Sequence, residues 1–139
     1  MKKLFLAFAA GFLATLLFHQ PVLWLLQLAG ITDRAPYAMA PVPPFGVPSV
    51  ISLAFWGGVW GIVMIPIVAR VRSEAGYWIA AIVFGAIFPS LVAKFVVMPL
   101  KGAPAGGGVN MLILGLSVNA AWGLGTALLY RLFNRGASR

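Results

Sequence analysis

Hydrophobic residues along the chain gather in four long runs, separated by short stretches rich in proline, glycine or charge. The runs cover about residues 4–28, 50–69, 77–98 and 111–133. Each is about 20 residues or longer, which is the length that an α-helix needs to cross the hydrocarbon core of a membrane. We therefore predict an all-α membrane protein, a four-transmembrane-helix bundle that forms a single domain over residues 1–139.

The first run follows two lysines, as the core of a secretory signal does. A signal core has about 7–15 residues, whereas the apolar character here continues from Leu4 to Leu28. We therefore expect a helix that is retained in the protein. We also expect a kink at Pro21, because a proline there leaves the carbonyl of Leu17 without its usual backbone donor.

The longest break between runs, residues 31–48, is apolar as well as rich in proline. Five of the ten prolines of the chain lie in it: Pro36, Pro41, Pro43, Pro44 and Pro48. Proline fixes φ and has no N–H, so this segment is neither a helix nor a central strand. We expect an ordered, extended loop on the outer side, packed on the bundle through apolar side chains such as Tyr37 and Phe45.

The amino-acid composition limits how much of the protein surface can face water. Hydrophobic residues make up 62% of it and charged residues 9%, whereas a soluble domain is about a quarter charged. Most of the surface must therefore face lipid. The absence of cysteine excludes disulfides and thiol chemistry. The two acids, Asp33 and Glu74, fall outside the apolar runs, so proton coupling through an intramembrane carboxylate is not expected.

The basic residues give the predicted orientation. In four spans both termini lie on one side, and that side holds seven of the ten basic residues: Lys2, Lys3, Arg70, Arg72, Arg131, Arg135 and Arg139. The positive-inside rule then places both termini in the cytoplasm of a bacterial-type inner membrane. The net charge of +8 is explained by these helix ends, so we expect no nucleic acid as a partner.

A weak repeat relates the two halves of the chain. Gly46-Val47 and Trp60-Gly61 recur as Gly108-Val109 and Trp122-Gly123, and each pair is shifted by 62 residues. A true repeat would give two helix-loop-helix hairpins with the same orientation. Chance matches between apolar segments are the alternative.

Small residues lie on one face of two of the runs. Ala54, Gly57 and Gly61 are spaced by three or four residues, and Gly115 and Gly123 share a face of the last run. Small residues allow helix backbones to approach closely in lipid. We predict that they pack helices within the bundle, with dimerisation or docking of a partner as the alternative.

Polar residues within the runs suggest a binding site. His19, Gln20, Lys94 and Asn119 all fall in the outer half of the predicted spans. Polar groups in hydrocarbon usually face the bundle interior or water. Our hypothesis is a pocket that opens outward, in which Asp33 or a bound anion compensates the charge of Lys94. The alternatives are a snorkelling Lys94, an Asn119 that makes only an interhelical hydrogen bond, and a His19 satisfied in the core.

No motif for catalysis is present, because the sequence has no Ser/His/Asp arrangement and no phosphate-binding loop. We expect no enzymatic activity and no cofactor. The alternative is that His19, together with Met39 or Met98, ligates Cu(I) or haem. Two classes of function remain. The first is an accessory, assembly or regulatory subunit that acts by helix packing, in contact with lipids and as a homodimer or part of a larger membrane complex. The second is a small carrier or channel for an anion or neutral solute.

Overall fold

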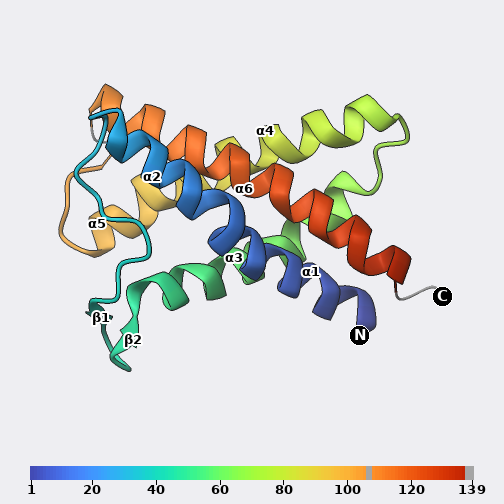
Figure 1. Ribbon diagram of the computed structural model, residues 1–139, viewed down its shortest axis with the longest axis horizontal. Coiled ribbons are helices and arrows are strands. Elements are labelled where there is room, and N and C mark those ends of the chain that lie inside the picture. The colour runs from blue at the N-terminus through green and yellow to red at the C-terminus, as the bar shows by residue number, and fades with distance from the viewer. Residues whose placement is uncertain (106–107, 137–139) are drawn as a thin grey trace.

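The computed structural model describes residues 1–105 and 108–136, and it is helical apart from its loops and one short hairpin (Figure 1). Within these residues, four helical segments are long and apolar enough to cross a membrane: Lys2–Leu28, Ser49–Val68, Glu74–Leu100 and Val109–Gly136. The prediction of an all-helical chain with four candidate spans is confirmed. Both ends of the described chain lie at the same end of the bundle, opposite to the two long loops (Figure 1).

The third span begins at Glu74, three residues before the start expected from hydrophobicity. Ser73 explains the difference, because its side-chain oxygen accepts a hydrogen bond from the N–H of Gly76 at 3.1 Å. Such an N-cap supplies a partner to an N–H that the helix itself leaves unpaired, and the carboxylate of Glu74 suits the positive end of the helix dipole. The cap at Ser73 therefore allows the helix to begin before the apolar run that starts at Tyr77.

The first and third spans are each interrupted by a π-turn just before a proline. The first span consists of α1 (Lys2–Ala14), the π-turn η1 (Thr15–His19) and α2 (Gln20–Leu28). The third consists of α4 (Glu74–Val92), the π-turn η2 (Ala93–Val97) and α5 (Met98–Leu100). Pro21 and Pro99 each lie two residues after their π-turn. The expected irregularity at Pro21 is thus a π-turn, and a second π-turn precedes Pro99.

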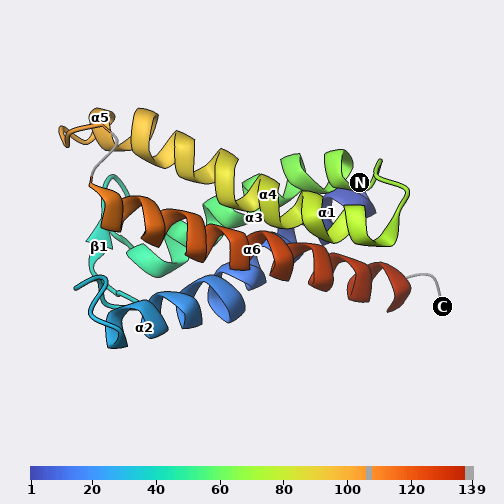
Figure 2. The ribbon, with the colours of Figure 1, turned by 90° about the horizontal axis from the view of Figure 1, so that it is seen from above.

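The remaining spans are α3 (Ser49–Val68) and α6 (Val109–Gly136). Helix α1 packs along α3, and α4 packs along α6, so that the bundle consists of two hairpins (Figures 1 and 2). Glycine makes both crossings possible. A Cβ atom on Gly11 would lie 2.2 Å from the carbonyl oxygen of Gly57, and one on Gly123 would lie 2.3 Å from that of Ala81. Helix backbones are therefore in direct contact in both hairpins.

The hairpins meet along two seams that differ in packing. In the closed seam, between α1–α2 and α6, the ring of Phe18 lies against Gly125 and the indole N–H of Trp122 donates to the carbonyl of Gly11 at 3.0 Å. The open seam, between α3 and α4, has far fewer contacts. In the described part of the chain, neither η2 nor α5 packs against α3, whereas η1 and α2 both pack against α6.

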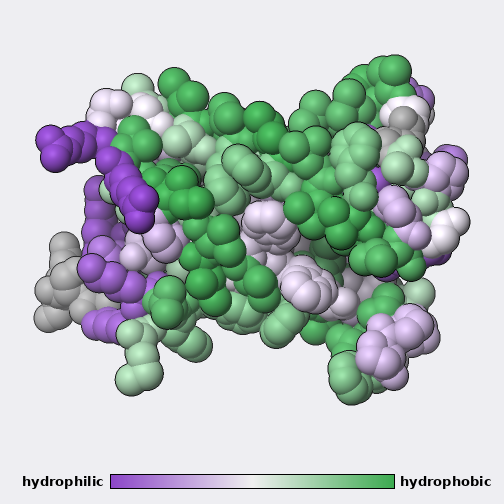
Figure 3. Space-filling view, turned by 180° about the vertical axis from the view of Figure 1, so that it is seen from behind, coloured by the Kyte–Doolittle hydropathy of each residue, from purple (hydrophilic) through white to green (hydrophobic). Residues whose placement is uncertain are grey.

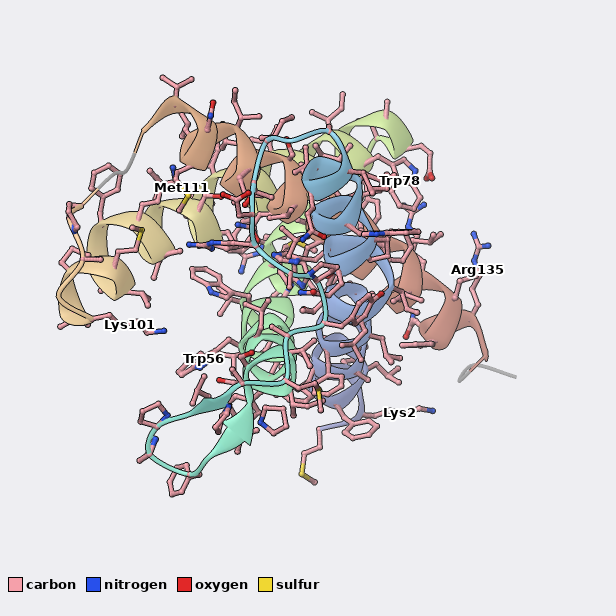
Figure 4. All side chains as sticks on the ribbon, turned by 60° about the vertical axis from the view of Figure 1, so that its left-hand side comes forward. Lys2, Trp56, Trp78, Lys101, Met111 and Arg135 are labelled. Carbon is pink, nitrogen blue, oxygen red and sulfur yellow. The ribbon has the colours of Figure 1, made fainter. Side chains whose placement is uncertain are left out.

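The proline-rich segment forms a small antiparallel hairpin. Strand β1 (Pro41–Val42) pairs with β2 (Val47–Pro48), and the ribbon projects away from the helices (Figure 4). The ring of Phe45 at its tip is 87% exposed. The expectation that this loop packs on the bundle is therefore wrong for the tip, because its five prolines stiffen a ribbon that leads away from the helices. The start of the loop is bonded to the first span, at Ile31 and at Tyr37.

Candidate functional site

A first polar group lies at the π-turn of the first span. The side chain of Gln20 is 2% exposed, and its Oε1 accepts a hydrogen bond from the backbone N–H of Tyr37 at 2.6 Å. The amide nitrogen of Gln20 lies 3.3 Å from Nδ1 of His19. The hydroxyl of Tyr37 donates to the carbonyl of Leu16 at 2.7 Å. Tyr37, which has a φ of 51°, is thus held at both its backbone and its side chain.

The π-turn explains why the carbonyl of Leu16 needs this partner. The N–H of Gln20 bonds to the carbonyl of Thr15, as a π-turn requires. The next residue is Pro21, which has no N–H. The carbonyl of Leu16 therefore lacks a backbone donor, and the hydroxyl of Tyr37 replaces it. Because of the π-turn, the carbonyl that takes a side-chain donor is that of Leu16 rather than that of Leu17.

We predict that Tyr37→Phe loosens the start of the proline-rich loop. An unpaired carbonyl next to apolar surroundings costs about 1–3 kcal/mol, so opening of residues 35–48 becomes roughly tenfold more frequent. Amide hydrogen exchange of these residues in detergent measures the effect. Tyr77→Phe is the matched control, because it removes a tyrosine hydroxyl that donates to Ala127 at the other end of the bundle. Equal loop exchange in both variants would contradict the prediction.

A second polar group lies between α4 and α6. Lys94, in η2, is 5% exposed, and a Cβ atom on Gly115 of α6 would lie 3.5 Å from its Cε. The stem of Lys94 is therefore directed toward α6 and not into the surrounding lipid. One turn earlier, the buried hydroxyl of Ser90 accepts a hydrogen bond from Nδ2 of Asn119 at 2.9 Å. The absence of a side chain at Gly115 leaves room for Ser90 and Lys94.

Ser90 and Lys94 line a crevice of about 350 Å³ between the parts of these two spans that lie away from the termini. Its other walls are apolar or glycine: Ile87, Leu91, Phe95, Gly108, Val109, Leu112 and Leu116. One side of the crevice is formed by α4 and η2, and the other by Gly108 and the start of α6. It is an apolar cavity with a cation and a hydroxyl on one wall, which is a composition typical of small-ligand sites.

The residues predicted for one pocket are thus distributed over the half of the bundle that lies opposite to the termini. Lys94 lines the crevice, and Asn119 is linked to it through Ser90. His19 and Gln20 belong to the group around Tyr37 and do not line the crevice. Asp33 is exposed in the loop after α2. The spacing of these residues predicts the face of the helix on which each lies, but it does not predict which other helix that face contacts.

The residues predicted for helix packing lie inside the bundle. Ala54 is fully buried, Gly57 and Gly61 face α1, Gly123 faces α4, and Gly115 lies beside Lys94. Their partners Gly11 and Gly85 were missed. A signal was available, because Ala7 and Ala81 each precede these glycines by four residues, which is the small-x-x-x-small spacing of close helix pairs.

At the end that carries the termini, Arg131 joins α4 to α6. Its guanidinium pairs with the carboxylate of Glu74 and lies 3.8 Å from the ring centre of Tyr77 and 4.9 Å from that of Trp78. The indole of Trp78 also donates to Glu74 at 2.9 Å. Ion pairing and cation–π contacts together make this a structural clasp.

The polar atoms around Tyr37 are bonded to one another, whereas Lys94 and Ser90 in the crevice can orient an anion or a hydrogen-bonding ligand. Within the described residues, no three His, Cys, Asp or Glu side chains are grouped so that they could hold a metal ion. Comparison of the chain with protein-family models, with curated proteins and with solved structures found no match.

Proposed function

We propose that this protein is a non-catalytic accessory subunit that binds a transmembrane helix of a larger membrane protein along its open seam. The observation that carries the proposal is the difference between the two seams. The closed seam is filled by α1, η1 and α2 against α6, whereas the equivalent outer part of the open seam has no protein segment in it among the described residues.

Two aromatic side chains meet across the open seam, Trp60 of α3 and Phe84 of α4, and Trp56 and Phe88 each lie one turn away on the same helices. The rings of Trp60 and Phe84 meet edge to face at 6.2 Å, and those of Phe84 and Phe88 stack at 4.7 Å. Trp56 is 58% exposed and Phe88 is 51% exposed. The view from behind shows an apolar face with paler side chains in a hollow at its centre, while polar groups gather at the two ends (Figure 3).

These features favour an apolar transmembrane helix as the occupant. No charged residue occurs among positions 49–68 of α3 or 75–92 of α4, so the seam offers no charge to attract a soluble partner. Helices in lipid associate through van der Waals packing, and rigid aromatic side chains provide large contact areas at low entropic cost. The hairpins already associate in this way along the closed seam.

The second class of function, a carrier, is supported by Lys94 and by the prolines within the spans. A carrier needs a route that continues to the other side of the membrane. At the middle of the bundle, however, the glycine crossings bring backbones into contact in both hairpins. This closure favours the accessory role over transport.

The proposed orientation is a multi-pass protein of a bacterial-type inner membrane, with both termini in the cytoplasm. The excess of basic residues on the side of the termini supports it. A reporter that is active only outside the cytoplasm, fused after Arg139, should remain inactive. The same reporter inserted at the hairpin tip, after Phe45, should be active, and the reverse result would overturn the orientation.

Photo-crosslinking in intact cells tests the accessory role. A photoreactive phenylalanine derivative at position 56 should capture one partner protein, whereas the same group at position 25 of α2 should capture lipid. Trp56 and Leu25 are a matched pair, because they are 58% and 59% exposed. Trp56→Ala should lower recovery of the same partner about tenfold, as expected for an aromatic hot spot. Adducts at position 56 with lipid alone, or with a second copy of this chain, would overturn the proposal.

A further inference from the structure

We propose that the hairpin ribbon β1–β2 inserts its tip into the lipid interface beside the bundle, with the ring of Phe45 among the first carbons of the acyl chains. The partner of this surface is the bilayer itself, at the end of the bundle opposite to the termini. The inference does not depend on the accessory role, because neither strand packs against α4 in the described part of the chain.

The first argument is the level of the ribbon in the membrane. Helix α3 has 20 residues, so it is about 30 Å long, which matches the thickness of the hydrocarbon core. An α3 that spans the membrane must therefore begin at the hydrocarbon boundary. Strand β2 ends at Pro48 and α3 begins at Ser49, so no spacer separates the ribbon from that boundary.

The second argument is the direction in which the ribbon leaves the helices. The candidate spans run roughly along the long axis of the molecule, whereas the ribbon turns to the side where α3 begins (Figures 1 and 2). In a membrane crossed by these spans, the tip of the ribbon therefore lies over the lipid beside the bundle. A ribbon that continued along the long axis would instead enter the water.

Hydrogen bonds to the first turn of α3 fix this direction. The backbone N–H of Ser49 donates to the carbonyl of Ala40 at 2.9 Å. The N–H of Val50 donates to the carbonyl of Ala38 at 3.0 Å, and the hydroxyl of Ser49 donates to the same carbonyl at 2.7 Å. The first N–H groups of a helix have no partner within it. The base of the ribbon therefore caps α3, and the ribbon keeps a set orientation to the span.

The third argument is composition. Residues 38–48 contain no charged, hydroxyl or amide side chain, and four of these eleven residues are prolines, which have no N–H to be desolvated. The side chain of Phe45 is 87% exposed at the tip, and that of Met39 is 66% exposed. Insertion at the interface buries this apolar surface and desolvates few polar groups.

The same features argue against a soluble protein as the partner. Each strand has only two residues, so the ribbon offers little edge to which a strand of another chain can pair. It also has no charge that could steer a partner or fix its orientation. A bilayer requires neither feature and surrounds the bundle at this level.

The test uses the full chain in phosphatidylcholine vesicles, with a single spin label in each variant. The chain has no cysteine, so Pro43→Cys provides one labelling site at the tip and leaves Phe45 in place. This label should be protected from a water-soluble nickel chelate, as should a label at Leu25→Cys, which is 59% exposed within the first span.

A label at Asp33→Cys, in the exposed loop after α2, is the control in water. It should be roughly tenfold more accessible to the chelate than the label at position 43, because burial of one phenylalanine ring favours the inserted state by about this factor or more. Equal accessibility at positions 33 and 43 would overturn the proposal.

Two further variants test the ring as the anchor. In the Pro43→Cys protein, Phe45→Asp should raise accessibility of the label to the chelate roughly tenfold, because the anchor is lost and a carboxylate disfavours insertion. Phe45→Leu, which retains an apolar side chain, should leave the label protected. Equal protection in the two variants would refute the role of Phe45.

Photo-crosslinking provides a second measurement that retains Pro43 and an aromatic ring. A photoreactive phenylalanine derivative at position 45 should form adducts with lipid in the same vesicles, whereas the same group at position 33 should not. In intact cells, an adduct of position 45 with a protein would overturn the assignment to the bilayer. The accessory role is tested at position 56, so the two proposals can fail separately.

Discussion

Gly123→Ala is expected to destabilise the bundle by about 3 kcal/mol or more, at the upper end of the range for overpacking. The added Cβ atom would lie 2.3 Å from the carbonyl oxygen of Ala81 and 3.0 Å from Cα of Gly85. Both neighbours belong to the backbone of α4, so α4 and α6 must move apart. The substitution should raise intrinsic helix propensity by about 1 kcal/mol. A loss of stability can therefore come only from packing.

Gly115→Ala provides the matched control on the same face of the same helix. A Cβ atom there would meet Lys94 and Ser90 at 3.5 Å, which is an ordinary van der Waals distance. This variant should be as stable as the unmodified protein or slightly more stable. Melting temperatures of the two variants in one detergent measure the difference. Equal melting temperatures would show that the glycine crossing is not close-packed.

Trp122→Ala is expected to destabilise the protein by about 3–5 kcal/mol. Trp122 is 2% exposed in the closed seam, so its removal leaves a cavity between the hairpins. It also removes the indole N–H that bonds to the carbonyl of Gly11. That carbonyl accepts a further hydrogen bond from the hydroxyl of Thr15 at 3.1 Å, and it remains bonded in the variant. Most of the loss should therefore come from the cavity.

Trp60→Ala is the comparison for Trp122→Ala, because the two tryptophans are related by the 62-residue shift of the predicted repeat. Trp60 lies in the open seam and is only partly buried, so its loss should lower the melting temperature much less. Trp122→Phe, which retains a ring but has no donor, separates packing from the hydrogen bond. If the two alanine variants were equally destabilised, the distinction between a closed and an open seam would be refuted.

The sequence was sufficient to predict the four candidate spans, because their hydrophobicity requires lipid and their length matches a membrane. It was not sufficient to predict the π-turns. Pro21 removes a donor whatever the local geometry, so a proline alone does not distinguish a kink from a π-turn. The start of the third span depended on the side chain of Ser73, which hydrophobicity does not detect.

The arrangement of the candidate site was harder to predict for a related reason. Periodicity places Asn119 on one face of α6 and His19 on one face of the first span, but the order of helices around the bundle decides which faces meet. The close contacts of Gly11 with α3 and of Gly85 with α6 show which helices pair within each hairpin. The role of Tyr37 depended on a contact between residues 21 positions apart, which no local pattern indicates.

The two hairpins are held together by different means on opposite sides. The turn at residues 69–73 links α3 to α4 covalently at the end that carries the termini. On the other side, α1 and α6 have no covalent link, and they adhere through side-chain packing and the hydrogen bond from Trp122 to Gly11. The turn therefore joins α3 and α4, the helices of the open seam, at one end only. If the hairpins rock about the closed seam, the turn restrains the end near the termini. The open seam between α3 and α4 then widens mainly at the opposite end.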